Sequence, residues 1–333
     1  RINLACMKLL VTGGLGFIGS NFILNTLKND EKISITNIDA ELLGSDHNNL
    51  LELKNSSNYH FVKGNITNRN LMEKLIESSD IVVNFAAESF VDRSILDANQ
   101  FLVSNIRGTY TILEILRKQK KRFIQISTDE VYGSLENDSA TEEYRFNPSN
   151  PYAATKASAE LLVNSFVKTY DLDCVITRCT NNYGPRQFYE KLIPKTIFLA
   201  NNNKKIPIYG KGKNIRDWIF VDDHCDAVYN VLMNGESGQS YNISANNEID
   251  NISLVKKILE IMDKSSDLIN FVEDRPGHDL RYSLDSTKIR NSLGWNNKTN
   301  FDDAIRKTID WVLNQSDIQN VQKETFDPTP WKK

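Results

Sequence analysis

The chain has 333 residues, of which 40% are hydrophobic, and its 40 basic and 43 acidic residues give a formal net charge of −3. This length exceeds what one hydrophobic core usually serves, so we expect a large domain and a smaller partner domain. The slight negative charge offers no attraction toward nucleic acid or an anionic membrane, and the apolar runs fall far short of the roughly 20 residues that span a bilayer. These features argue against nucleic-acid and membrane partners and favour a small-molecule role.

The N-terminus and the cysteines indicate where the protein works. We expect Met7 to be the native start, because the first six residues contain an arginine and lack the apolar segment of a secretory signal. Four cysteines are too few for a disulfide framework in a chain this long, and they lack the paired spacing of metal ligands. The sequence therefore predicts a cytoplasmic protein without a metal site.

Short apolar runs in the first half of the chain alternate with segments of helix length. Several runs are apolar at successive positions, which is typical of strands that are buried on both faces of a parallel sheet. This alternation predicts an α/β fold with a doubly wound, Rossmann-type parallel sheet. The predicted strands are Lys8–Gly13, Ser34–Asp39, His60–Gly64, Ile81–Ala86, Phe123–Thr128 and Cys174–Arg178.

The pattern changes after about Pro185, where we expect a smaller mixed α/β domain for the substrate. We predict an NAD-binding domain over 7–184 with return segments near 215–245, a sugar-nucleotide-binding domain over 185–315, and a tail over 316–333. The expected isolated strands are Ile206–Tyr209, Tyr241–Ser244 and Ile269–Val272, and the expected helices are Asp222–Met233, Ser253–Met262 and Phe301–Leu313.

A glycine motif follows the first predicted strand and opens a helix. Gly13 permits a tight turn, Gly16 lets the backbone approach a pyrophosphate, and Gly19 allows close contact between helix and sheet. Asp39 stands twenty residues after Gly19, at the end of the next strand, where a carboxylate binds a ribose hydroxyl. Ala40 follows Asp39 with no arginine nearby, and a carboxylate repels a 2′-phosphate. The motif therefore predicts NAD rather than NADP as the cofactor.

Tyr152 and Lys156 lie four residues apart at the start of a predicted helix, so that both face the same side. An adjacent ammonium and an oxidised nicotinamide ring favour the phenolate, so we expect a lowered pKa for Tyr152 and a role as base. Lys156 is also expected to orient the nicotinamide ribose. On its own this spacing is common, and the alternative interpretation is a surface tyrosine beside an ordinary lysine. The glycine motif earlier in the chain favours the catalytic interpretation.

Thr128, Asp129 and Glu130 come directly after a predicted strand, at the edge where open α/β sheets bind ligands. Two adjacent carboxyl groups in a cleft resist double ionisation, so their pKa values should separate and leave one acid and one base. A solvated acidic loop is the alternative for an isolated Asp-Glu pair. Beside a cofactor, the pair suits elimination chemistry.

Beyond these motifs, the chain resembles the extended short-chain dehydrogenase/reductase family and, within it, the dTDP-glucose 4,6-dehydratases. The resemblance extends from Met7 to about Leu313. The Thr-Asp-Glu triplet, together with the EKLIP-like, RDW and RPGHD segments, distinguishes the dehydratases from their relatives. The stretches that carry the resemblance are Val11–Ser20, Asn84–Ile95, Ser127–Gly133, Asn150–Ala159, Arg178–Pro194, Tyr209–His224 and Asp274–Tyr282.

The resemblance implies a lyase that converts a nucleotide-linked glucose to its 4-keto-6-deoxy derivative in three steps. Tyr152, with Thr128 on the same oxygen, would take the 4-hydroxyl proton as hydride leaves C4 for NAD. Glu130 would then remove the C5 proton while protonated Asp129 gives its proton to the departing 6-hydroxyl. Hydride would finally return to C6 and a proton to C5, so that a tightly bound NAD is not consumed.

The resemblance also implies two sets of binding residues. Those expected at the cofactor, besides Tyr152 and Lys156, are Gly13, Gly16, Phe17, Ile18, Gly19, Asp39, Asn65, Ile66, Phe85, Ala86, Ala87, Ser127 and Cys179. Those expected at the sugar and its diphosphate, besides Thr128, are Ser89, Asn182, Glu190, Lys191, Arg216, Asn247, Arg275 and His278. Arginines offer a planar fork of donors to phosphate oxygens, and a lysine offers a point charge. Cys179 need not react; a low-pKa thiolate there is the minor interpretation.

The chain departs from the family pattern at several places. Phe90 replaces a usual histidine, Asn65 replaces a usual aspartate, the stretch Leu42–Asn49 lacks the usual tyrosine, and the tail after Gln315 does not follow the family. Phe90 and the stretch Leu42–Asn49 leave two features of the substrate open. The nucleotide is that of a dTDP- or a UDP-linked sugar, and the sugar is glucose or an N-acetylated relative.

Other functions share part of this pattern. A sugar-nucleotide epimerase or decarboxylase uses NAD and the Tyr–Lys pair without an acid/base pair at Asp129 and Glu130. A non-catalytic Rossmann binding module typically lacks the Tyr–Lys pair. By analogy with the family, we also expect a homodimer formed through the helices around Asp97–Lys118 and Ala153–Tyr170, and a place in the synthesis of deoxysugars such as rhamnose.

Overall fold

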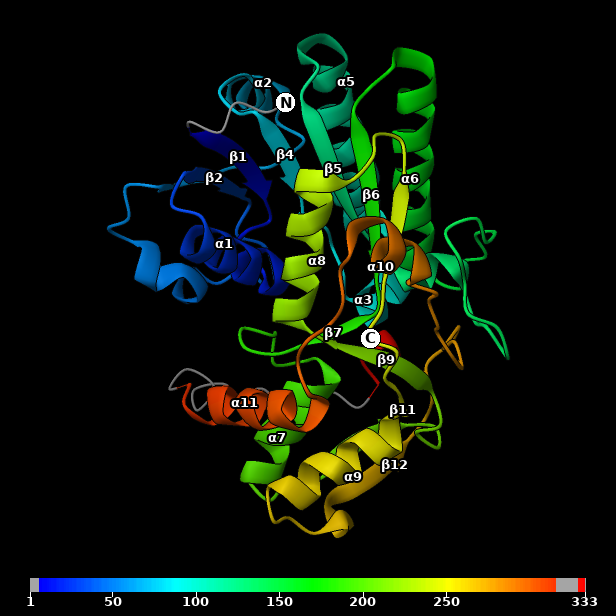
Figure 1. Cartoon of the computed structure of the whole chain (residues 1–333). Helices are drawn as coiled ribbons and strands as arrows, with labels where there is room; N and C mark the ends of the chain where they lie inside the picture. Colours follow the sequence, from blue (N-terminus) through cyan, green and yellow to red (C-terminus); the bar gives the residue numbers. More distant parts are fainter. Residues whose placement is uncertain (1–5, 316–328, 333) are drawn as a thin grey trace.

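The computed structural model describes residues 6–315 and 329–332, and the expectations for the first five residues and for most of the tail lie outside these ranges. A seven-stranded parallel sheet forms the centre of the larger part of the molecule (Figure 1). It confirms the predicted Rossmann-type fold. In spatial order, its strands are β10 (Ser240–Ile243), β6 (Cys174–Cys179), β5 (Arg122–Thr128), β4 (Ile81–Asn84), β1 (Met7–Thr12), β2 (Ile33–Asp39) and β3 (Tyr59–Lys63).

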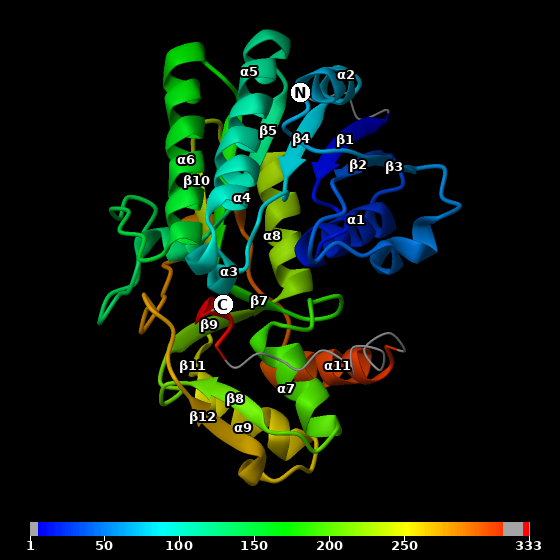
Figure 2. The same cartoon turned by 180° about the vertical axis from the view of Figure 1, so that it is seen from behind.

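Helices cover both faces of this sheet because most of its strands are apolar on both sides. Alternate residues of β1 show the division: Leu9 and Val11 pack in one core cluster and Leu10 in another. The first face, toward the viewer in Figure 1, carries α1 (Phe17–Asn29), α8 (Val221–Asn234) and α10 (Thr287–Leu293). The second face, toward the viewer in Figure 2, carries α2 (Arg69–Glu77), α5 (Thr109–Gln119) and α6 (Pro151–Tyr170).

The smaller part of the molecule lies below the carboxyl ends of the central strands in Figure 1 and has its own apolar clusters. Two small sheets build it. One contains β11 (Glu248–Asp250), β9 (Ile215–Phe220) and β7 (Asn181–Tyr183), and the other contains β12 (Ile269–Val272) and β8 (Ile206–Tyr209). The helices packed around them are α7 (Leu192–Asn201), α9 (Asn251–Ile261) and α11 (Phe301–Leu313).

Three expectations about this region need correction. The segment 241–244 is not an isolated strand: β10 pairs in parallel with β6 and forms the edge of the central sheet. The segments 206–209 and 269–272 are not isolated either, because β8 and β12 pair with each other. The strands β7, β9 and β11 escaped prediction because two of them are only three residues long and β9 carries charged Arg216 and Asp217. The domain boundary near residue 184 stays a prediction.

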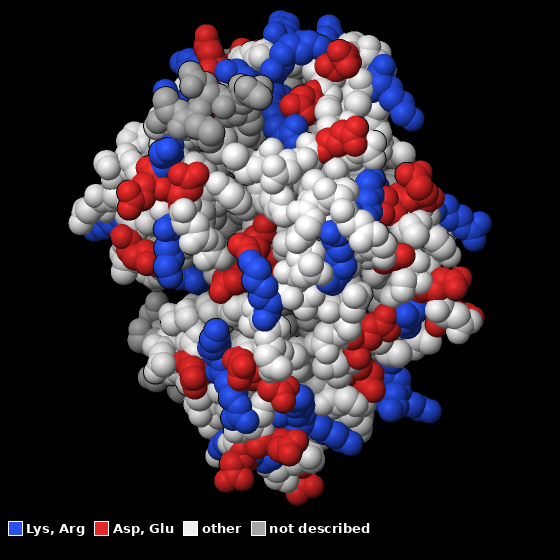
Figure 3. Space-filling view, viewed as in Figure 1, with Lys and Arg blue, Asp and Glu red and all other residues white. Residues whose placement is uncertain are grey.

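Several short elements complete the described chain. The last described residues, 329–332, dock beside α3, where the ring of Trp331 packs edge-on against Tyr209. Basic and acidic side chains are interspersed over the face in Figure 3. The short elements are η1 (His47–Leu53), α3 (Val91–Leu96), α4 (Asn99–Phe101), the π-helical turn η2 (Leu102–Gly108), η3 (Asp129–Tyr132), η4 (Ser266–Leu268) and η6 (Pro330–Lys332).

No helix in the described part of the chain combines the length and the apolar character that crossing a membrane requires. Within the same ranges, no group of three or more His, Cys, Asp or Glu side chains is arranged to hold a metal ion. The cysteines Cys6, Cys174, Cys179 and Cys225 are free thiols.

Candidate active site

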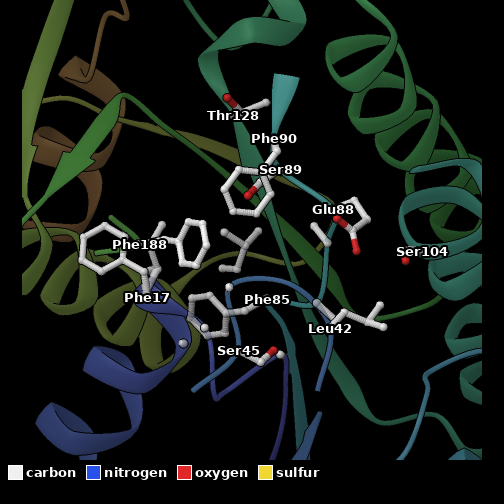
Figure 4. Close-up of a pocket in the computed structure, with 18 of the residues that line it drawn as sticks. Phe17, Leu42, Ser45, Phe85, Glu88, Ser89, Phe90, Ser104, Thr128 and Phe188 are labelled. Atoms are coloured by element: carbon white, nitrogen blue, oxygen red, sulfur yellow. The ribbon is translucent and has the colours of Figure 1, made fainter. Parts of the chain in front are cut away.

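The strand order of the central sheet reverses between β1 and β4, and a cavity of ≈ 310 Å³ lies at the carboxyl ends of these strands. This is the place where open α/β sheets bind their ligands. Every residue expected at the cofactor lines the cavity, as do Thr128, Asp129 and Glu130. Segments from Gly13 to Lys191 therefore converge on one site, part of which Figure 4 shows.

The glycine motif forms an open cradle. Gly13 has φ +69°, and a Cβ atom there would lie 2.6 Å from the backbone nitrogen of Ala86. A Cβ on Gly16 would meet one atom within 4 Å, the carbonyl oxygen of Gly13 at 3.3 Å, so this glycine faces open space. Gly16 also precedes α1 without a capping side chain, which leaves N–H groups of the first helical turn available to an anion. The cradle fits a dinucleotide pyrophosphate.

Gly19 plays a somewhat different part from the one expected. A Cβ atom there would lie 2.5 Å from the carbonyl oxygen of Gly13 and 2.9 Å from the Cα of Gly14. The missing side chain thus lets α1 approach the glycine loop itself rather than the sheet.

Asp39 ends β2 at the rim of the cavity and also organises the loops around it. Its carboxylate accepts hydrogen bonds from the backbone nitrogen of Leu15 at 3.0 Å, from that of Glu41 at 2.8 Å and from the hydroxyl of Ser45 at 2.8 Å. The side chain therefore joins the glycine loop to the loop after β2. Both loops line the cavity beside the carboxylate, which suits contact with an adenosine ribose.

Tyr152 and Lys156 lie in the first turns of α6, and both are buried. The helix begins sharply because Asn150 accepts a hydrogen bond from the backbone nitrogen of Ala153 at 2.9 Å and because Pro151 occupies the first turn. Lys156 donates a hydrogen bond to the carbonyl of Ile126 at 2.6 Å, and burial lowers its pKa to about 8. The helix start thus fixes both side chains against the end of β5.

The pKa of Tyr152 differs from the expected direction. Burial raises it well above 10, and the negative charge of Glu130 adds to the rise, while a hydrogen bond with Thr128 opposes it. The ammonium of Lys156 is directed at Ile126 and does not offset the burial. Within this chain alone Tyr152 is therefore a neutral phenol, and lowering its pKa requires a positive charge brought by the bound cofactor.

Asp129 matches the expectation of a carboxyl group that keeps its proton. Burial raises its pKa to about 8, and the charge of the neighbouring Glu130 adds to the rise. The hydroxyl of Thr128 donates to its Oδ1 at 3.1 Å, whereas Oδ2 is buried without a hydrogen-bond partner among the described residues. A protonated acid at the cavity wall can serve as a proton donor.

Glu130 also reaches the cavity, and two residues that the sequence did not reveal hold it. Two side chains contact its Oε2: the amide of Asn150 donates to it at 3.2 Å, and the hydroxyl of Tyr282 lies 3.3 Å away. Asn150 had a local signal, since asparagine before proline is typical of a helix N-cap. Tyr282 had no local signal for this contact, because 152 residues separate it from Glu130.

Three of the residues expected at the substrate, besides Thr128, line the cavity: Ser89, Asn182 and Lys191. The ammonium of Lys191 donates to the carbonyl of Ser89 at 3.0 Å and lies 4.6 Å from the ring centre of Phe90. Burial lowers the pKa of Lys191, opposed chiefly by the charge of Glu130. The amide of Asn182 is held on both sides, by the carbonyl of Thr180 at 3.0 Å and by the ring nitrogen Nδ1 of His224 at 2.9 Å.

The other expected substrate residues do not line the cavity. Glu190 pairs with Arg93 at 2.9 Å, and His278 contacts Asp274 at 2.6 Å through Nδ1. Arg275 donates to Asp92 at 3.0 Å, and Arg216 donates to the carbonyl of Asp279 at 2.9 Å. For Asn247, the amide nitrogen is buried without a described partner. The roles of these five residues remain predictions.

An aromatic wall stands near the cavity centre. Phe90 and Phe188 meet edge to face with ring centres 5.1 Å apart, and Figure 4 shows them near Phe17 and Phe85. The position of Phe90 agrees with its expected place beside the site. Sequence reasoning did not identify Phe188, or Glu88, whose burial raises its pKa.

Cys179 lines the cavity but is not an activated thiol. Burial raises the pKa of this thiol to about 12, and the charge of Asp129 adds to the rise. The thiol contacts the carbonyl of Ser127 at 3.5 Å. The minor interpretation of a low-pKa thiolate is therefore wrong.

Comparison with known proteins agrees with this geometry. The model of the family described as GDP-mannose 4,6 dehydratase matches residues 10–308. The chain is 47% identical over 308 residues to the low-salt glycan biosynthesis protein Agl12 of Haloferax volcanii, covering 92% of this chain and 99% of that protein. It is 43% identical over 309 residues to a dTDP-glucose 4,6-dehydratase of Mycobacterium tuberculosis, covering 92% and 93%.

A solved structure extends the likeness to three dimensions. The crystal structure of DesIV, a dTDP-glucose 4,6-dehydratase from Streptomyces venezuelae with NAD bound, matches with a TM-score of 0.89 at 39% identity, covering 92% of this chain and 96% of that one. A family model that spans most of the chain and relatives of this similarity lead to one conclusion: the chain belongs to the GDP-mannose 4,6 dehydratase family of extended short-chain dehydrogenases/reductases.

Proposed function

We propose that this protein catalyses the NAD-dependent 4,6-dehydration of dTDP-glucose to dTDP-4-keto-6-deoxyglucose. The observation that carries the proposal is the convergence, in one cavity, of a glycine cradle, a Tyr–Lys pair and two carboxyl groups. One of these groups, Asp129, has a pKa raised to about 8, so that it keeps its proton near neutrality. The similarity to named dTDP-glucose 4,6-dehydratases supports the choice of sugar nucleotide.

NAD, when bound, supplies the hydride acceptor for C4 and the hydride donor for C6. The residues of the chain handle the protons. Tyr152 takes the 4-hydroxyl proton, and the hydroxyl of Thr128 holds the same oxygen. Glu130 takes the C5 proton, whose acidity rises once C4 is a ketone, and the electron pair of that bond moves toward the carbonyl. Asp129 gives its proton to the 6-hydroxyl, which then leaves as water.

Position supports these roles. Thr128, Asp129 and Glu130 extend from the end of β5, and α6 brings Tyr152 and Lys156 to the same strand end. The hydrogen bond between Thr128 and Asp129 keeps the acid beside Thr128, whose hydroxyl also interacts with Tyr152. The burial of Asp129 and Tyr152 limits the access of water, which strengthens electrostatic interactions within the site.

The test is a comparison of dTDP-glucose, UDP-glucose, UDP-N-acetylglucosamine and GDP-mannose at equal concentration, with product identified by mass and NMR. The proposal expects a 4-keto-6-deoxy product formed fastest from dTDP-glucose. Faster turnover of a UDP- or GDP-linked sugar would change the substrate. An inverted hydroxyl at C4 without loss of water would instead assign the chain to the epimerases of the same superfamily.

We further propose a cytoplasmic homodimer that serves the synthesis of deoxysugars, rhamnose among them. Helices α5 and α6 lie side by side in Figure 2, and apolar side chains on this layer are exposed: Leu161 by 59%, Leu102 by 48% and Tyr110 by 45%. A four-helix bundle with a second copy would cover them. The free thiols in the described chain suit a reducing compartment. Light scattering of the purified protein measures the mass of the assembly.

A further inference from the structure

Three oxygen atoms form a buried chain behind the candidate C5 base. The hydroxyl of Tyr282 lies 2.6 Å from Oδ2 of Asp279 and 3.3 Å from Oε2 of Glu130. Tyr282 is 2% exposed and Asp279 6% exposed, so water does not readily replace the contact between them. Tyr282 belongs to none of the catalytic or binding sets derived above, although it lies between two carboxyl groups.

The geometry holds Tyr282 firmly. Its ring lies under the guanidinium of Arg216 at 4.1 Å, and Arg216 in turn donates to the carbonyl of Asp279 at 2.9 Å. The other oxygen of Asp279, Oδ1, accepts a hydrogen bond from the hydroxyl of Ser149 at 2.6 Å. Burial raises the pKa of Tyr282 well above 10, and the charge of Glu130 adds to the rise. Tyr282 is therefore a fixed, neutral phenol.

A phenol has one proton, and this one faces two carboxyl oxygens. When both carboxyl groups are ionised, Tyr282 donates to the nearer one, Asp279, and turns a lone pair toward Glu130. When Glu130 carries a proton on Oε2, it donates to Tyr282 while Tyr282 donates to Asp279, and each contact becomes a hydrogen bond. The arrangement thus offers a hydrogen-bond acceptor to protonated Glu130, which is the form that exists after this residue has acted as a base.

We propose that Tyr282 and Asp279 are positioning residues for Glu130, which accept the hydrogen bond of its protonated form and so assist removal of the C5 proton. In this step the C5–H bond breaks, its electron pair moves toward the C4 carbonyl, and the proton passes to Glu130. A half-turn of the carboxyl group then brings the protonated oxygen to Tyr282. Asn150, which donates a hydrogen bond to Oε2, keeps Glu130 next to the start of α6. This inference rests on the proposed function.

The test is Tyr282→Phe, which removes the hydroxyl and keeps the ring. Variant and wild type are mixed with dTDP-glucose, and reduced nicotinamide and the 4-keto-6-deoxy product are followed separately. We expect kcat to fall roughly 10- to 100-fold with KM changed less than about threefold, since protonated Glu130 loses its acceptor together with the hydrogen bond from Tyr282 to the Asp279 carboxylate that supports it. Reduced nicotinamide should accumulate, and substrate deuterated at C5 should show a larger isotope effect than with wild type. Asp279→Asn keeps an oxygen acceptor for Tyr282. This variant should therefore accumulate less reduced nicotinamide than Tyr282→Phe and show a smaller rise in the C5 isotope effect.

Tyr241→Phe is the matched control, because Tyr241 is also 2% exposed and its hydroxyl accepts a hydrogen bond from the backbone nitrogen of Glu236, away from Glu130. The Tyr241→Phe variant should have a lower free energy of unfolding than wild type but should not accumulate reduced nicotinamide. The inference is overturned if Tyr282→Phe turns over like wild type, or if oxidation and elimination slow equally, as general misfolding would cause. A wild-type enzyme that makes no 4-keto-6-deoxy product would instead overturn the proposed function itself.

Discussion

Arg275 and Asp92 form an ion pair between the RPGHD segment and α3, with Nη1 and Oδ1 3.0 Å apart. The guanidinium Nε of Arg275 is buried without a partner in the described chain, which leaves a donor for an incoming anion. Burial works against the charge of Arg275, but Asp92 and Glu130 outweigh it and raise the pKa of the guanidinium above its usual value. The side chain is therefore charged and fixed before a diphosphate arrives.

Arg275→Lys is expected to raise KM for the nucleotide sugar by roughly tenfold, because lysine loses the planar fork of donors. Asp92→Asn should raise KM less, since Arg275 remains but is no longer held. Steady-state kinetics measure both. Arg69→Lys, at a pair with Glu73 on the surface of α2, is the control and should leave KM unchanged. An unchanged KM in Arg275→Lys would remove this residue from the substrate site.

The glycine cradle predicts two different defects. Gly16→Val should abolish retention of NAD while leaving the Tm of the NAD-free protein nearly unchanged, because its side chain would project into open space where the pyrophosphate is expected. Gly13→Ala should lower Tm, since a Cβ atom would lie 2.6 Å from backbone at a positive φ. Cofactor content and thermal unfolding separate the two effects. Full NAD occupancy in Gly16→Val would place the cofactor elsewhere.

The raised pKa of Asp129 predicts a pH dependence with a definite sign. A carboxyl group whose pKa rises from 3.8 to about 8 on folding stabilises the fold most below pH ~4, and this contribution is lost as the pH rises through about 8. The free energy of unfolding of wild type should therefore decline across this window relative to that of Asp129→Asn, which does not titrate. Denaturant unfolding at several pH values measures the difference; parallel curves would mean that Asp129 is ionised when folded.

Glu130→Gln should separate oxidation from elimination. The amide keeps the shape of the side chain but cannot take the C5 proton, so reduced nicotinamide should accumulate while kcat for the 4-keto-6-deoxy product falls roughly 10²- to 10⁴-fold. Absorbance of the reduced cofactor and product analysis measure the two steps independently. Turnover close to wild type would show that another group is the base.

What the sequence could predict was local. The glycine loop, Asp39 and the Tyr152–Lys156 pair each follow from a strand end or a helix start, and the structure brings them into one cavity. The Thr-Asp-Glu triplet was placed by the same reasoning, since it directly follows β5. Buried parallel strands were also visible, because their apolar runs need no information from distant segments.

What escaped prediction depends on contacts between distant segments. Pairing of β10 with β6 completes the central sheet, yet neither strand specifies its neighbour. Arg275 forms its ion pair with Asp92, and Glu190 forms its ion pair with Arg93. Both partners belong to α3, which is far away in the sequence. The pKa of Tyr152 depends on burial and on where the ammonium of Lys156 points, which helical spacing alone does not reveal.

The central claim is that one site removes hydride from C4 and returns it to C6 of the same sugar. Substrate deuterated at C4 tests it most directly, with the product examined by NMR. The account predicts that the deuterium appears at C6 of the 4-keto-6-deoxy sugar. Deuterium that is retained at C4, or lost to solvent, would contradict it.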